Sequence, residues 1–107
     1  HDANQERGQK TATFSPRIPA SGDYEIRLLY TAHENRSTKT SVTIRNGVHE
    51  QTVKVNQRLA PPSLGVFHLR PGKTFEVIVS NADADGFVVV DGLQLILRST
   101  SNSREVD

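Results

Sequence analysis

The sequence contains no cysteine, methionine or tryptophan. Without cysteine the chain can form no disulfide, no thiolate metal site and no thiol nucleophile. Aromatic residues are also scarce, with two Tyr and four Phe, so few rings are available to stack on a ligand. Recognition by this chain therefore has to rely mainly on side chains that form hydrogen bonds.

A strong net charge and long apolar segments are missing as well. The formal charge is +1, and the basic and acidic side chains are interspersed, which argues against nucleic acid or a membrane surface as a partner. No apolar run approaches the roughly 18 residues of a transmembrane helix, and no signal peptide is recognisable. The length of 107 residues fits one domain. Because the sequence begins at His1 rather than Met, we expect a piece of a longer protein.

Alternation with period two is the dominant pattern of the sequence. It predicts strands with one buried face over residues 11–14, 24–30, 42–45, 52–56 and 75–80. The more continuous apolar runs at 87–90 and 93–97 indicate central or doubly covered strands. No window has a helical period.

Turn residues separate these segments. Asn46-Gly47 predicts a type I′ hairpin turn, which needs positive φ at both central residues. Pro71-Gly72 predicts a second turn, in which proline presets φ.

The pattern as a whole predicts an all-β fold. We expect an antiparallel β-sandwich of about eight strands with a jelly-roll-like form. The sandwich should span residues 1–98, and residues 99–107 should form a polar linker or tail.

Catalytic and metal-binding groupings are weak in this sequence. Ser, His and Asp occur, but no Gly-x-Ser-x-Gly nucleophile elbow is present, so we expect no enzyme activity from this domain and no cofactor. The histidines are not spaced as transition-metal pairs. A structural calcium is the remaining option, and its candidate oxygen ligands are Asp2, Asn4, Asp83 and Asp85. Alternatively, these residues are solvated loop charges.

Two loop segments after predicted strands are dense in hydrogen-bonding side chains. Their candidate ligand-binding residues are Tyr30, His33, Asn35, Arg36, Asn56, Gln57 and Arg58. Amide and guanidinium groups can make paired contacts with vicinal hydroxyls or carboxylates, and arginine favours an acidic or sulfated glycan. The alternative is that the Asn side chains cap turns and the Arg side chains cover apolar surface.

Several segments resemble one known family when taken in order. Residues 11–30 (TATFSPRIPASGDYEIRLLY) are similar to the opening of the golvesin/xanthan lyase carbohydrate-binding-like domain. The later segments VKVNQ at 53–57, LGVF at 64–67 and GFVVVDGL at 86–93 resemble later markers of the same family. The resemblance covers residues 1 to about 97.

The resemblance implies a jelly-roll-like sandwich appended to larger bacterial proteins that are secreted, periplasmic or in the cell envelope. Hosts of such domains include polysaccharide lyases and FAD-dependent oxidoreductases of planctomycete-type bacteria. We therefore expect a noncatalytic carbohydrate-binding-like accessory module. Its partners would be a polysaccharide, of acidic or sulfated type, and the domains of its parent enzyme.

One rival expectation stays open. The domain could be a structural or protein-interaction module that packs on its parent enzyme and has no glycan ligand. A polar cluster that is more than half buried and bonded to itself would favour this alternative.

Overall fold

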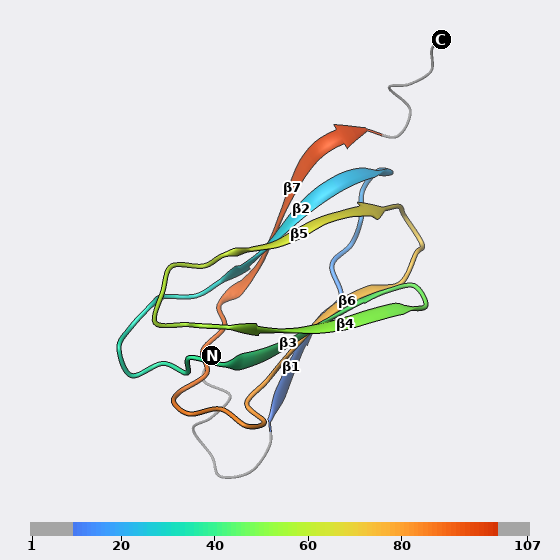
Figure 1. The fold of residues 1–107 in the computed structure, drawn as a ribbon. Coiled ribbons are helices and arrows are strands. Elements are labelled where there is room, and N and C mark those ends of the chain that lie inside the picture. The colour runs from blue at the N-terminus through green and yellow to red at the C-terminus, as the bar shows by residue number, and fades with distance from the viewer. Residues whose placement is uncertain (1–9, 101–107) are drawn as a thin grey trace.

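The computed structural model describes residues 10–100. These residues form two antiparallel sheets that pack face to face (Figure 1). The strands are β1 (Thr11–Phe14), β2 (Gly22–Leu29), β3 (Thr40–Asn46), β4 (His49–Val55), β5 (Ser63–Leu69), β6 (Phe75–Ser80) and β7 (Gly92–Thr100). The predicted all-β sandwich is confirmed, with seven strands in place of about eight.

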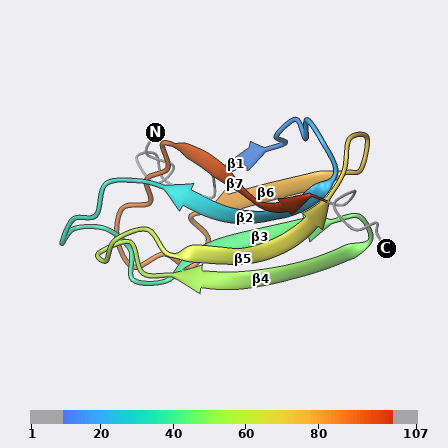
Figure 2. The same ribbon diagram turned by 90° about the horizontal axis from the view of Figure 1, so that it is seen from above.

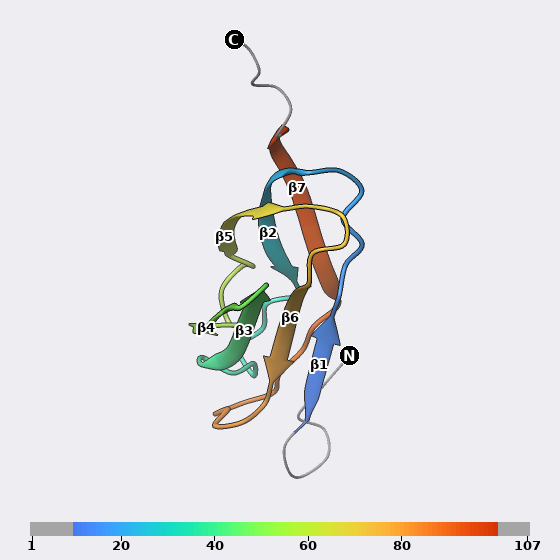
Figure 3. The ribbon, with the colours of Figure 1, turned by 90° about the vertical axis from the view of Figure 1, so that its right-hand side faces the viewer.

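The strands alternate between the two sheets along the chain. One sheet has the order β1-β6-β3-β4 and the other the order β5-β2-β7, as Figure 3 shows. Every connection except the β3–β4 hairpin therefore crosses from one sheet to the other, a wrapping shared with jelly rolls. The connections gather at the two ends of the sandwich (Figure 2).

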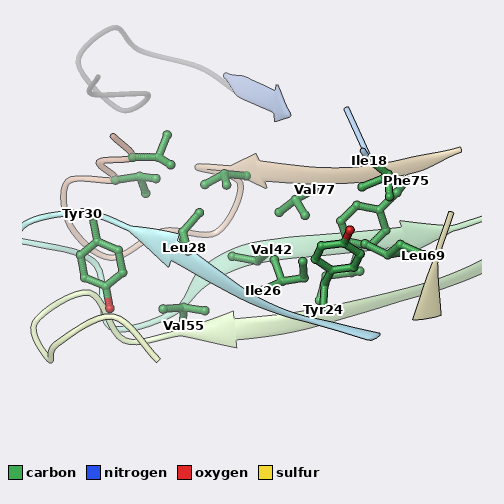
Figure 4. Packing of buried hydrophobic residues seen from close by; sticks show 14 residues of the cluster. Ile18, Tyr24, Ile26, Leu28, Tyr30, Val42, Val55, Leu69, Phe75 and Val77 are labelled. Carbon is green, nitrogen blue, oxygen red and sulfur yellow. The ribbon is translucent and has the colours of Figure 1, made fainter. Parts of the chain in front are cut away.

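The core follows directly from the period-two pattern. Tyr24, Ile26 and Leu28 of β2 all point inward, and none is more than 4% exposed. They meet the inward side chains of the other sheet, which include Val42 and Val77 (Figure 4). Burying each aliphatic side chain of this size contributes about 1.5–3 kcal/mol, so these alternating positions hold the two sheets together.

The two continuous apolar runs behave differently from the prediction. Residues 87–90 form isolated bridges rather than a strand, and Phe87 pairs with Arg36. β7 lies at an edge of its sheet, and its residues are half-buried or exposed. The prediction of a central or doubly covered strand at 93–97 is therefore wrong. β7 also continues through Thr100, beyond the predicted limit of the sandwich at 98.

The two predicted turns are present, but one has a different geometry. Lys73 N donates to Arg70 O at 3.2 Å, and Gly72 has φ +83°, which fits a type II turn with proline at its first central position. The hairpin loop is Gly47-Val48, and Gly47 has φ +64° while Val48 is not in the positive region. A type II′ turn thus replaces the predicted type I′ turn at Asn46-Gly47.

No helix that could cross a membrane occurs within residues 10–100.

Candidate functional site

Three connections meet at one end of the sandwich, seen on the left of Figure 1. They are residues 30–39, 56–62 and 81–91, and this region is called the loop end below. Phe87 N donates to Asn35 O at 3.0 Å, and Ser37 N donates to Phe87 O at 2.8 Å. These bonds join two of the connections side by side over a short parallel bridge.

Gly86 is needed for this close approach. A Cβ atom at position 86 would lie 2.8 Å from both the carbonyl carbon and the carbonyl oxygen of Arg36. Backbone atoms cannot move aside as a flexible side chain can, so a larger residue would push the two connections apart.

Gln57 links the third connection to the other two. Its side chain is fully buried, and its backbone N donates to Ser37 O at 2.8 Å. Its Nε2 donates to Val89 O at 2.6 Å, and its Oε1 accepts from Val89 N at 3.1 Å and from Thr40 Oγ1 at 3.2 Å. The amide of Gln57 thus satisfies buried backbone groups.

Tyr30 and Asn56 also form hydrogen bonds with backbone groups of the loop at 56–62. Tyr30 is 7% exposed, and its hydroxyl donates to Leu59 O at 2.9 Å. Burial raises the pKa of the Tyr30 hydroxyl above its usual value. The Oδ1 of Asn56 accepts from Arg58 N at 3.0 Å, a local turn of the kind that Asn side chains favour.

The remaining candidates lie at the surface of the loop end. Arg58 Nε donates to Arg36 O at 2.9 Å, so the second arginine is anchored on the backbone of the first. Arg36 donates from Nε to Thr31 O at 3.3 Å and from Nη1 to Asn35 Oδ1 at 2.8 Å. His33 accepts from Asn35 N through Nδ1 at 3.1 Å. These contacts fix four polar side chains next to one another.

The structure therefore brings all seven predicted residues to one end of the sandwich, in two groups. Tyr30 and Gln57 are buried, and with Asn56 they hold the loops together. The second group consists of the exposed His33, Asn35 and Arg58 together with the half-buried Arg36, which contacts Asn35 and Arg58.

Asp85 is a structural residue that the sequence pattern did not reveal. Its carboxylate accepts from Thr38 N at 2.8 Å, from Thr38 Oγ1 at 2.5 Å and from Ser37 Oγ at 3.1 Å. The bonds from Thr38, side chain first and then backbone, contribute most to lowering the pKa of Asp85 to about 2. Asp85 thereby ties residues 37–38 to the connection that carries it.

A calcium site gains no geometric support from the part of the chain that the structure describes. Asp83 is exposed and has φ +63°, while Asp85 is engaged by Ser37 and Thr38. Within residues 10–100 no three acidic or histidine side chains converge on one point. The other two candidates, Asp2 and Asn4, lie outside the described residues.

A hollow of about 310 Å³ lies away from the loop end, between the edges of the two sheets. It is lined by Ile44, Asn46, His49, Glu50, Gln51 and Phe67. The sequence pattern contained a signal for it, because positions 49 and 51 continue the inward alternation of Val53 and Val55 with polar residues.

Comparison with known proteins gives the chain a family. Residues 1–97 match the model of the golvesin C-terminal domain. A xanthan lyase from Bacillus sp. (strain GL1) is 30% identical over 102 residues, which is 90% of this chain and 11% of that protein. The solved structure of a Paenibacillus xanthan lyase superposes with a TM-score of 0.79 at 29% identity, over 90% of this chain and 10% of that one.

The chain spans about a tenth of the length of both lyases. The similarity is thus to one accessory region of a much larger enzyme. The family match covers nearly the whole sequence, and the superposition extends the agreement to the sandwich itself. The chain belongs to the golvesin C-terminal domain family.

Proposed function

We propose that this domain is a noncatalytic accessory module that binds acidic polysaccharide at the loop end. The binding residues would be His33, Asn35, Arg36 and Arg58. The observation that carries the proposal is the arginine pair, which is anchored in place and has no ion pair with any carboxylate of residues 10–100.

The anchoring leaves both outer nitrogens of Arg58 and Nη2 of Arg36 available. Arg58 uses Nε for the bond to Arg36 O, and its Nη1 and Nη2 form no hydrogen bond within the described structure. A guanidinium held by Nε presents a planar pair of donors that matches a carboxylate or sulfate. The neighbouring Asn35 and His33 could add hydrogen bonds to sugar hydroxyls.

The comparisons support an accessory role. Both matched proteins are named xanthan lyases, and this chain corresponds to about a tenth of each. A domain of this kind would hold a larger protein against its polysaccharide while other regions perform the chemistry. Such a parent protein would act outside the cytoplasm, in the secreted, periplasmic or envelope fraction.

Each site should bind weakly, because the loop end offers few aromatic side chains for stacking. Attachment to a parent protein with further contacts to the same polymer would raise the effective affinity.

The test is affinity electrophoresis of the 107-residue chain in gels that contain xanthan, chondroitin sulfate or neutral dextran, with and without calcium. We expect retardation by the two acidic polymers, and we expect Arg36→Ala with Arg58→Ala to abolish it. Arg70→Ala is the matched control, since Arg70 is an exposed arginine in the turn at the opposite end of the sandwich. Retardation that survives the double substitution would sink the proposed site.

A structural module is the second candidate, and the burial of Tyr30 and Gln57 favours it. Tyr30 and Gln57 form hydrogen bonds within the domain and stabilise its loops. In this case the loop end would pack on the parent enzyme. Folded protein that none of the polymers retards would support this candidate over the first.

A further inference from the structure

The inner face of the sandwich turns polar towards the β3–β4 hairpin. In the register of these strands Ile44 pairs with Gln51, and Asn46 pairs with His49. Directly paired residues share one face of a sheet, and Ile44 is buried in the core with 1% exposure. Asn46, His49 and Gln51 therefore point to the side on which the core lies.

Burial decreases along β4 in the same direction. Val55 is buried, Val53 is half-buried, and Gln51 and His49 are exposed. Figure 1 shows the two sheets diverging towards this hairpin, and the hollow of about 310 Å³ occupies the space that results. Its volume is near the lower limit of small-molecule sites, which range over about 300–1,000 Å³.

The hollow combines one apolar wall with unused polar groups. Phe67 of β5 pairs with the buried Tyr24, so its ring faces inward, where it lies 5.8 Å from the ring of Phe75. No hydrogen bond within residues 10–100 engages the side chain of His49 or of Gln51. The Oδ1 of Asn46 is buried and lacks a partner, which costs about 1–3 kcal/mol unless a donor reaches it.

We propose that this hollow binds a single uncharged sugar ring, such as a chain end or a side branch of a polysaccharide. The amide of Gln51 and the ring of His49 supply donors and acceptors for neighbouring hydroxyls. A sugar hydroxyl, after a small rotation of the amide, would give Asn46 Oδ1 its missing donor. The apolar face of the sugar ring would lie against the half-buried Phe67.

The lining also selects against an acidic sugar. It contains one carboxylate, that of Glu50, and no lysine or arginine. The Glu50 carboxylate accepts from Arg45 Nε at 2.9 Å on the outer face. The lining therefore offers no lysine or arginine to balance the charge of an acidic sugar. The hollow and the loop end thus differ in the charge of the sugar that each would accept.

This inference deepens the proposed polysaccharide function but uses different residues. The loop end lies at the far end of β4, about 20 Å away for six residues at about 3.3 Å each. Loss of one site therefore should not remove the other.

The test is NMR titration of the isotope-labelled 107-residue chain with methyl β-D-glucopyranoside and methyl α-D-mannopyranoside. We expect saturable shift changes centred on Asn46, His49, Gln51 and Phe67 with at least one of the two sugars. The double substitution His49→Ala and Gln51→Ala should raise the dissociation constant at least tenfold, which corresponds to a loss of about 1.4 kcal/mol in binding free energy. Thr52→Ala, on the outer face of the same strand, is the matched control and should bind as the wild type does.

The outcomes separate the two sites. Shift changes that centre on Arg36 and Arg58 instead of the hollow would overturn this inference and leave the proposed function standing. Shift changes in the hollow that persist in Arg36→Ala with Arg58→Ala, while retardation by acidic polymers is lost, would support both. Absence of saturable shifts with both sugars, or equal weakening by Thr52→Ala, would overturn the hollow as a sugar site.

Discussion

The side-chain amide of Gln57 pairs with both backbone polar groups of Val89, as a neighbouring strand would. Nε2 donates to Val89 O at 2.6 Å, and Val89 N donates to Oε1 at 3.1 Å. Two residues earlier in the same segment, Phe87 pairs with the backbone of Asn35 and Ser37. Phe87 and Val89 thereby pair their backbone N–H and C=O groups without joining either sheet.

Replacing Gln57 should therefore weaken the whole loop end. Gln57→Ala would leave the half-buried N–H and C=O of Val89 without their partners and would open a cavity at a fully buried side chain. We therefore expect a loss of about 2–4 kcal/mol in the free energy of unfolding. Urea denaturation measures this loss. Gln51→Ala is the control, because it removes the amide of an exposed residue of β4. It should change the free energy of unfolding by less than about 0.5 kcal/mol. Equal losses in the two variants would show that Gln57 has no special role.

The buried role of Gln57 could have been read from the sequence. Val53, Val55 and Gln57 continue one period-two series, and the first two of these positions face the core. The same holds for Tyr30, which follows Tyr24, Ile26 and Leu28. The chemistry of both residues suggests a ligand site, whereas their spacing predicts burial.

Other features depend on contacts that sequence patterns do not specify. An apolar run such as 87–90 could be a strand, and what prevents it is pairing with residues about 30 to 50 positions away along the chain. The hydrogen bonds from Ser37 and Thr38 to Asp85 also join residues that are far apart in sequence. By contrast, the strands β2, β3 and β6 were predictable because each carries a local alternation with one fully buried face.

The hydrogen bonds that Asp85 accepts from Ser37 and Thr38 should make the stability of the domain depend on pH in the acid range. The folded pKa of about 2 lies below the ordinary value of 3.8, so the ionised carboxylate stabilises the folded state. This contribution is complete above about pH 4 and is lost as the pH falls towards about 2. The thermal unfolding midpoint of Asp85→Asn should therefore fall less steeply than that of the wild type across this interval.

Asp83→Asn is the matched control for this pH profile. Asp83 is exposed, and asparagine tolerates the positive φ of that position. A profile for Asp85→Asn that runs parallel to those of the wild type and Asp83→Asn would contradict the stabilising role of the ionised Asp85 carboxylate. Asp23 and Glu25 also have lowered pKa values, through His68 and Arg98 respectively, so the comparison rests on differences between variants.

Gly86 should tolerate no side chain. In Gly86→Ala the new Cβ would overlap the backbone of Arg36 at 2.8 Å, and we expect a loss of about 1–3 kcal/mol in the free energy of unfolding. Gly92→Ala provides the contrast, because its Cβ would meet Leu29 at an ordinary 3.9 Å and its φ is not in the positive region. That variant should be neutral or more stable by up to about 1 kcal/mol. Equal effects in the two variants would contradict the close approach at position 86.

The geometry of the arginine pair, rather than its charge alone, should decide binding at the loop end. Lysine keeps the positive charge but lacks both the anchoring Nε and the paired donors of guanidinium. If recognition is bidentate, Arg58→Lys should weaken retardation by xanthan or chondroitin sulfate nearly as much as Arg58→Ala does. If the pair acts as a diffuse positive charge, Arg58→Lys should bind like the wild type, and added salt should weaken both proteins equally. Affinity electrophoresis at two salt concentrations separates these outcomes, with Arg70→Lys as the control at the opposite end.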